Sequence, residues 1–382
     1  METMGEWFGL ETGHNDFTIE TESDADLFFA RHELNDRLIS MLRWAFRTSA
    51  PPKLVLYGDW GVGKTHTMRH IEYVIENNHD FPALVVFVEV PDIASKSTFQ
   101  VAHAALLDAL GFERAKTWVL QFQAKYPADA REQIQQFTQS GDIATAFANL
   151  LGFGEASRIA WDWLRGVALS AGDARLAGLP PSLVQSNHLV RVLQMFGKLC
   201  QEGEGKFLVF MLDEATKLGY VTNQDAINHW INSLKLIADS QTKEIGLIVS
   251  GSWIDPDDMS IPLQDEQVHS RFGDTNYIRL NNLDEEETLE FMRALLAQWV
   301  GAEQRAARME AFGAEADGEA ITTESFPFSD GGLKMAAAYA CRQGGFTTPR
   351  DIQKTIDDLL NRAIDDGRHI LSSSYVNSLV NA

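Results

Sequence analysis

Residues 58–65 form the part of the sequence whose types and spacing fit a defined chemistry. Gly58-x-x-x-x-Gly63-Lys64-Thr65 follows the short apolar run 54–57 and opens a stretch with helical character. Glycines let the backbone turn its N–H groups inward around an anion, and the start of the following helix adds positive potential. Lys64 can reach the β- and γ-phosphates of a nucleotide, and the Thr65 hydroxyl can ligate Mg²⁺. The pattern predicts a phosphate-binding loop.

We expect a bound nucleotide to contact the loop along its whole length. The expected contact residues are Gly58, Asp59, Trp60, Gly61, Val62, Gly63, Lys64, Thr65 and His66.

Two adjacent carboxylates follow a second buried strand. Phe207 to Leu212 are apolar, and Asp213 and Glu214 come directly after them. At the carboxyl end of its strand, Asp213 is expected to hold Mg²⁺ through water, and Glu214 to orient and deprotonate an attacking water. The alternative is a strand that happens to end in two surface acids. Together with the phosphate loop, the pair predicts hydrolysis of ATP, with ATP and Mg²⁺ as cofactors.

Further polar residues stand where a ring-forming ATPase needs them. Ser250 and Ser252 end the next strand, and either hydroxyl could hold the attacking water; we choose Ser252, with an ordinary turn serine as the alternative. Arg271 precedes a short strand and can reach the γ-phosphate of a neighbouring subunit, with a surface salt bridge as the alternative. Arg350 begins a helix and can touch the nucleotide of its own chain. An ion pair with Asp351 is its alternative.

The elements that must position these side chains alternate between strand and helix. Apolar, β-branched runs predict strands at 54–57, 83–90, 206–213, 244–250 and 277–280. Helical periodicity precedes the first strand at 27–48 and recurs between the strands. The sequence therefore predicts an α/β fold: a P-loop NTPase parallel sheet with helices on both faces, a helical insertion and a C-terminal α-helical lid.

The helical insertion is expected at about 112–200, because that stretch has no convincing strand. Its helical patterns cover 113–125, 129–138, 142–151, 155–169 and 186–201. Trp161 and Trp163 are expected to pack its interior, with nucleic-acid stacking as the alternative. The predicted domains are an N-terminal arm or loop (1–26), an α/β ATPase core (27–282) and an α-helical lid (283–382). Within the lid, the acidic segment 313–330 is expected to be a mobile loop.

Charge and composition limit the classes of partner. The formal net charge is −22, which argues against a surface that grips nucleic acid throughout. Residues 113–198 hold nine Lys/Arg and seven Asp/Glu, a local net of +2, so the remainder carries −24. No apolar run approaches the ~18 residues of a membrane span, and no signal peptide is evident. Two distant cysteines, Cys200 and Cys341, favour a reduced cytoplasmic protein.

In its motifs the chain resembles the AAA+ ATPases. The matched elements are Gly58–Thr65 for Walker A, Phe207–Glu214 for Walker B, Ser270-Arg271-Phe272 for the arginine finger and Thr348-Pro349-Arg350 for sensor 2. Two departures stand out. Sensor 1 is usually Asn and here is Ser. The stretch Phe28 to Leu34 is similar to the Gly-Arg-Glu stretch of the initiator-like branch, which packs near the adenine, but it has Ala30 for the usual glycine.

Within that superfamily the chain is similar to origin-recognition ATPases, to TniB/TnsC-like transposition regulators and to ATP-binding proteins of bacterial phage-defence loci. Val90–Phe99 carries the likeness to the transposition regulators, and Trp163–Gly166 the likeness to the defence group. The resemblance implies a homo-oligomeric ring or helical filament with ATP sites between subunits. It also implies a protein partner from the same system, duplex DNA as a candidate partner, and no membrane.

Lys96, Ser97 and Thr98 are the candidates for contact with DNA phosphates, since related ATPases place substrate loops after the second strand. Capping of the next helix is the alternative role for this segment.

Three function classes remain open from the sequence. The first is a DNA-loaded switch serving transposition target selection, replication or phage defence. The second is a protein-remodelling or signalling ATPase without direct DNA contact, which the acidic charge favours. The third is a low-turnover nucleotide-sensing scaffold, which the serine at sensor 1 favours.

Overall fold

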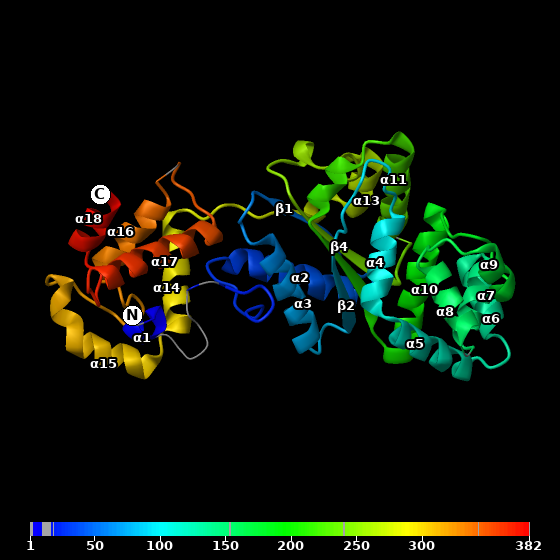
Figure 1. Cartoon of the computed structure of the whole chain (residues 1–382), viewed down its shortest axis with the longest axis horizontal. Helices are drawn as coiled ribbons and strands as arrows, with labels where there is room; N and C mark the ends of the chain where they lie inside the picture. The colour runs from blue at the N-terminus through cyan, green and yellow to red at the C-terminus, as the bar shows by residue number, and fades with distance from the viewer. Residues whose placement is uncertain are drawn as a thin grey trace. The chain divides into compact units, whose positions relative to one another are not determined.

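The computed structural model describes residues 3–9, 17, 19–152, 154–239, 241–342 and 344–381 (Figure 1). Within it the chain forms two compact units. One comprises Met1–Arg37, Asp59–His70 and Leu280–Ala382, and the other comprises Leu38–Gly58 and Ile71–Arg279. Among the described residues, no helix is both long and apolar enough to cross a membrane.

A five-stranded parallel sheet forms the centre of the second unit, in the order β2-β3-β4-β1-β5. Its strands are β1 (Lys53–Gly58), β2 (Ala83–Glu89), β3 (Phe207–Asp213), β4 (Ile245–Ser252) and β5 (Tyr277–Arg279). Nearly every residue of β1, β3 and β4 is buried, which is why these strands read as continuous apolar runs rather than alternating ones.

The strand register brings three strand ends together. Gly58 of β1 lies opposite Ser252 of β4, and Leu212 of β3 lies opposite Val249 of β4. The carboxyl ends of β1, β4 and β3 therefore meet at one edge of the sheet.

Helices pack around this sheet, as the sequence predicted. α4 (Gln100–Leu110) contacts β2, α10 (Ser186–Glu204) contacts β3, and α11 (Gln224–Ala238) contacts β4 (Figure 1). The predicted α/β fold with its parallel sheet is confirmed.

The predicted insertion is helical along its described length. It contains α5 (Phe112–Lys125), α6 (Ala130–Thr138), α7 (Gly141–Leu150), α8 (Glu155–Leu164) and α9 (Ala171–Ala177). Trp161 and Trp163 are buried inside it, so the expectation of interior packing is confirmed. The helix expected to run to 169 ends at Leu164, because Gly166 takes a φ of 87°, which a right-handed helix cannot continue.

The first unit is helical and includes the N-terminus. After α2 (His32–Arg47) and α3 (Lys64–Asn77), which span both units, it contains α14 (Glu285–Trp299), α15 (Ala302–Phe312), α16 (Asp330–Ala340), α17 (Pro349–Asp365) and α18 (Ser373–Asn381). The expected irregular arm contains a short helix, α1 (Met4–Phe8), with Phe8 fully buried. Trp7 stacks on His369 with ring centres 4.2 Å apart, which fastens α1 to the C-terminal helices.

The segment 313–330 differs from the expected mobile loop. Phe326 and Phe328 within it are fully buried. The Glu319 carboxylate accepts hydrogen bonds from the hydroxyls of Ser329 and Ser373. These contacts fasten the segment to the helical core.

Candidate nucleotide-binding site

The loop between β1 and α3 has the backbone conformation that its glycines predict. Gly61 and Gly63 have φ values of 84° and 90°, a region that costs other residues strain. A side chain at Gly63 would meet no atom within 4 Å, so conformation rather than space requires glycine there. The Thr67 N–H and hydroxyl both donate to the Gly63 carbonyl at 2.8 Å, which closes the first turn of α3.

Lys64 lies along this loop. Its Nζ donates to the Asp59 carbonyl at 2.7 Å, and the residue is buried. Its charge is therefore held within the turn where phosphates are expected to bind. Thr65 follows it as the second residue of α3.

His66 and His70 join α3 to the segment that precedes α2. The ring of His66 hydrogen-bonds the Leu27 carbonyl, and burial lowers the pKa of His66. His70 stacks on Phe28 with ring centres 4.6 Å apart, and its Nδ1 lies 2.9 Å from the Ala25 carbonyl. The rings of His66 and His70 therefore both contact residues 25–28.

Ala30 adopts a backbone conformation that favours glycine. Its φ is 51°, in the left-handed region that glycine enters without strain. The next residue, Arg31, donates to the Asn281 carbonyl at 2.7 Å. Burial lowers the pKa of Arg31 to about 10.

Asp213 and Ser250 meet at the carboxyl edge of the sheet. The Ser250 hydroxyl donates to Asp213 Oδ1, and both residues are buried. Ser252, which the sequence favoured, bonds elsewhere: its backbone N–H donates to the Thr216 hydroxyl at 2.6 Å. Of the two serines, the structure brings Ser250 to the acidic pair.

Glu214 is held by a neighbouring lysine. Its φ of 55° is uncommon outside glycine, and its carboxylate lies 2.9 Å from Lys217 Nζ. Lys217 also binds the Glu89 carboxylate and donates to the Val90 carbonyl at 3.0 Å. Glu89 and Glu214 raise the pKa of Lys217, so the lysine stays protonated. Lys217 was not singled out from the sequence, because a lysine three residues after a glutamate is common on helical surfaces.

Arg271 lies on α13 (Glu266–Phe272), a short helix that was not predicted from the sequence. Its Nε is 3.6 Å from an Asp239 oxygen, and its Nη1 donates to the Gln267 carbonyl at 2.9 Å. The surface salt bridge named as the alternative therefore forms in the single chain. Such partly exposed pairs contribute about 0–1 kcal/mol and are easily exchanged.

Arg350 is the second residue of α17 and contacts the phosphate loop. Its guanidinium lies 5.1 Å from the centre of the Trp60 ring. Asp351 instead accepts a 2.7 Å hydrogen bond from Thr348 and lies 3.9 Å from Lys354. The ion pair considered between Arg350 and Asp351 is thus replaced by these contacts.

Lys96, Ser97 and Thr98 lie in the connection between β2 and α4. The residue before α4 is Phe99, which makes no side-chain cap, so the capping role considered for this segment is wrong. The Ser97 carbonyl accepts a 2.9 Å hydrogen bond from the Trp230 indole, and Lys96 is exposed.

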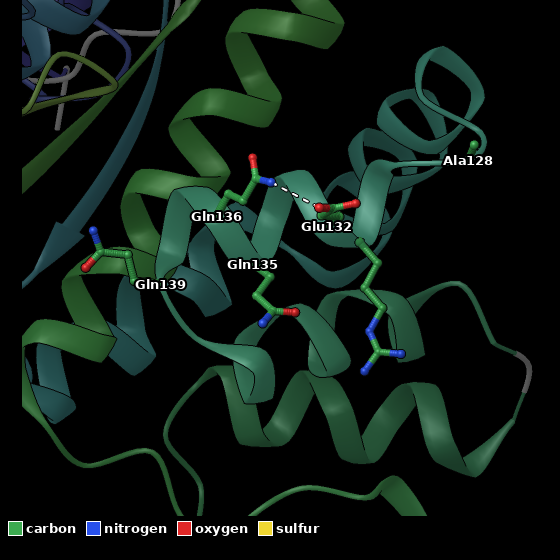
Figure 2. A pocket seen from close by; sticks show the side chains of 6 residues that line it. Ala128, Glu132, Gln135, Gln136 and Gln139 are labelled. Carbon is green, nitrogen blue, oxygen red and sulfur yellow. Dashed lines mark hydrogen bonds between the residues drawn. The ribbon is translucent and has the colours of Figure 1, made fainter.

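A hollow of about 690 Å³ lies on the insertion, apart from these residues. It is lined by Ala128, Arg131, Glu132, Gln135, Gln136 and Gln139. Figure 2 shows the Gln136 amide bonded to Glu132, and the donor–acceptor distance is 3.2 Å. This hollow was not predicted from the sequence, because the polar face of a helix normally meets solvent.

Comparison with known proteins identifies the fold. No family model and no curated protein matches the sequence. The solved structure of the Aeropyrum pernix ORC2 protein in ADPNP–ADP complexes aligns with a TM-score of 0.50 and 13% identity, over 93% of this chain and 68% of that chain. The chain has the fold of the AAA+ P-loop ATPases. The resemblance to the initiator-like AAA+ ATPases is thus confirmed at the level of the fold.

The Aeropyrum pernix ORC1 protein, solved in complex with DNA, aligns with a TM-score of 0.47 and 13% identity, over 93% of this chain and 66% of that chain. The chain therefore spans about two thirds of the length of the two ORC proteins.

Proposed function

We propose that this chain binds Mg-ATP at the 58–65 loop, hydrolyses it, and acts as an oligomerising switch in a DNA-directed process such as transposition target selection, replication or phage defence. One observation carries the proposal. The loop continues directly from β1, and the neighbouring strand β4 carries Ser250, which holds Asp213 at the end of β3. Ligands of open α/β sheets bind at this carboxyl edge.

The residue chemistry fits Mg-ATP. The left-handed glycines give the loop the concave backbone that receives phosphate oxygens. Mg²⁺ takes oxygen ligands, usually one or two carboxylates together with phosphates, which matches Thr65 and Asp213. The ADPNP and ADP in the ORC2 structure support nucleotide binding by this fold.

Each residue then has a distinct role. Lys64 binds the β- and γ-phosphates, and Thr65 and Asp213 hold the metal that neutralises developing charge. Ser250 fixes the orientation of Asp213, and Glu214 accepts the proton of the attacking water. Bound Mg-ATP supplies the phosphoryl group that is transferred.

A neighbouring copy is proposed to complete the site. Arg271 is only about two thirds buried, and its 3.6 Å pair with Asp239 is weak. In a head-to-tail assembly the guanidinium can leave Asp239 for the γ-phosphate of the next subunit and stabilise the transition state.

DNA contact is proposed at Lys96. The loop carrying it is held on both sides, by the bond from Trp230 to the Ser97 carbonyl and by backbone bonds from Thr222 and Asn223 to the Ser95 carbonyl. Lys96 is thus presented by a fixed loop. In a chain of net charge −22, phosphate binding must be local and strongly dependent on salt.

Hydrolysis measured with and without duplex DNA, beside a gel shift at low salt, tests the DNA-directed role. We expect DNA to bind in the presence of ATP and Mg²⁺ and to stimulate hydrolysis. Lys96→Ala should weaken DNA binding, whereas Lys334→Ala, an exposed lysine of α16, should not. Absence of DNA binding at low salt would overturn this role.

A low-turnover scaffold is the second candidate, because the Glu214 carboxylate is engaged by Lys217. Tight ATP binding with negligible turnover would favour it. Hydrolysis stimulated by a protein and not by DNA would instead favour the remodelling class, which the acidic net charge supports.

A further inference from the structure

Trp60 stands in the middle of the phosphate loop and has 64% of its surface exposed. The guanidinium of Arg350 lies over its ring, 5.1 Å from the centre. A cation above an aromatic face is attracted by the quadrupole of the ring, most strongly for tryptophan. The exposed Trp60 indole therefore contacts the Arg350 guanidinium.

The start of α17 also lies close to the next residue of the loop, Gly61. A Cβ on Gly61 would lie 3.1 Å from the Thr348 hydroxyl and 3.4 Å from Arg350 Cβ. A side chain at Gly61 would be crowded by this approach, and the φ of 84° there also favours glycine.

The backbone around Arg350 is fixed independently of the loop. Thr348 caps α17 by accepting from the Asp351 N–H, and Thr347 exchanges backbone hydrogen bonds of 2.8 and 2.9 Å with Leu283. What remains free is the long Arg350 side chain, which has many rotamers. Contact with the Trp60 ring favours the rotamers that place the guanidinium over the indole.

We propose that Trp60 is a positioning residue for Arg350. The indole face holds the guanidinium above the phosphate loop, where it meets the terminal phosphate of bound ATP. This inference rests on the proposed function of the loop. Trp60 then acts through Arg350 and raises the preference of the site for ATP over ADP.

The test compares the affinity for a slowly hydrolysed ATP analogue with the affinity for ADP in four proteins. Trp60→Leu keeps apolar bulk and removes the ring. It should reduce the preference for the analogue about two- to fivefold, the range of an exposed cation–π contact. Trp60→Phe, which restores a ring, should recover part of the loss. Trp44→Leu, at a comparably exposed tryptophan on α2, should behave as wild type.

A double-mutant cycle separates positioning from a general effect on the loop. In an Arg350→Ala background, Trp60→Leu should cause no further loss of preference. An equal loss in that background, or an equal loss of ADP and analogue binding in the single variant, would overturn the inference. A wild-type protein that binds neither nucleotide would overturn the proposed function itself.

Discussion

At the scale of single residues, Lys217 decides what Glu214 can do. The ion pair at 2.9 Å holds the carboxylate that is expected to accept a proton from water, and Glu89 shares the same lysine. A carboxylate in an ion pair must leave that contact before it can turn toward a water molecule. In the described structure the Glu214 carboxylate is therefore restrained by its ion pair with Lys217.

Lys217→Met should release Glu214 while keeping the length of the side chain. Since partly exposed ion pairs are worth about 0.2–1 kcal/mol, kcat for ATP should rise about 1.4- to fivefold. Steady-state hydrolysis measures this. Lys206→Met, at an exposed lysine before β3, serves as the control, and a fall in kcat for Lys217→Met would contradict the role.

The sequence identified most of these residues by type but not their partners. The motif predicted the loop because local backbone chemistry requires its glycines. The sequence favoured Ser252, whereas Ser250 meets Asp213, because both serines lie on one side of a strand whose end was predicted two residues early. The contact of Arg350 with Trp60 joins distant parts of the chain and leaves no periodic signal.

At the scale of elements, α10 positions β3 and shows packing overriding helix propensity. Gly197 lies in the middle of α10, where alanine is normally favoured by about 1 kcal/mol. A Cβ there would be 2.4 Å from the Glu244 carbonyl oxygen and 2.6 Å from Ile245 Cγ2 at the start of β4. Backbone atoms cannot move aside as a side-chain tip can.

Gly197→Ala should therefore destabilise the protein, by about 1–3 kcal/mol of overpacking against the smaller gain in propensity. Thermal unfolding measures it. Gly203→Ala in the same helix is the matched control, because the one close contact of its Cβ would be the amide end of Gln121, with Trp118 Cδ1 at an ordinary 3.6 Å. Equal effects of the two substitutions would contradict the close approach of α10 to β4.

The contacts of Glu319 make the stability of the C-terminal helices depend on pH. Hydrogen bonds from Ser329 and then Ser373 lower the pKa of the Glu319 carboxyl. The group therefore stabilises the fold above the ordinary glutamate pKa of about 4.3, and this contribution disappears as pH falls through the lower folded pKa.

Glu319→Gln should lower the Tm at pH 7 by about 2–3 °C, since bonds to a partly exposed carboxylate contribute roughly 1 kcal/mol after solvent screening. The difference from wild type should shrink at and below about pH 4. Calorimetry at the two pH values measures it. A difference that grows on acidification would contradict the assignment.

Element prediction failed mainly for short helices. α1, α9 and α13 have five to seven residues, too few to show a helical period. Longer, strongly patterned segments such as 113–125 and 186–201 were predicted close to their observed bounds, because one apolar face is repeated several times.

At the scale of the whole molecule, the proposal requires a neighbouring copy. Arg271 pairs with Asp239 in the single chain, so its proposed role appears only on assembly. Arg271→Ala should retain nucleotide binding and lose hydrolysis by about 1,000-fold, the low end of known arginine-finger effects.

Mixing two inactive variants tests that arrangement. In a random equal mixture of Arg271→Ala and Glu214→Gln chains, about one interface in four joins an intact Glu214 to an intact Arg271 in a head-to-tail assembly. Hydrolysis should recover to roughly that fraction of wild type. A mixture as inactive as its components would place Arg271 outside the shared site.

Hydrolysis of ATP by wild type and by Glu214→Gln, with nucleotide binding measured on the same samples in Mg²⁺, tests the central claim most directly. We predict that wild type turns over ATP and that Glu214→Gln binds it with unchanged affinity but hydrolyses it at least about 100-fold more slowly, the scale of general-base catalysis. Lys64→Ala should lose binding altogether. Unchanged hydrolysis in Glu214→Gln, or unchanged binding in Lys64→Ala, would contradict the assignment of this site.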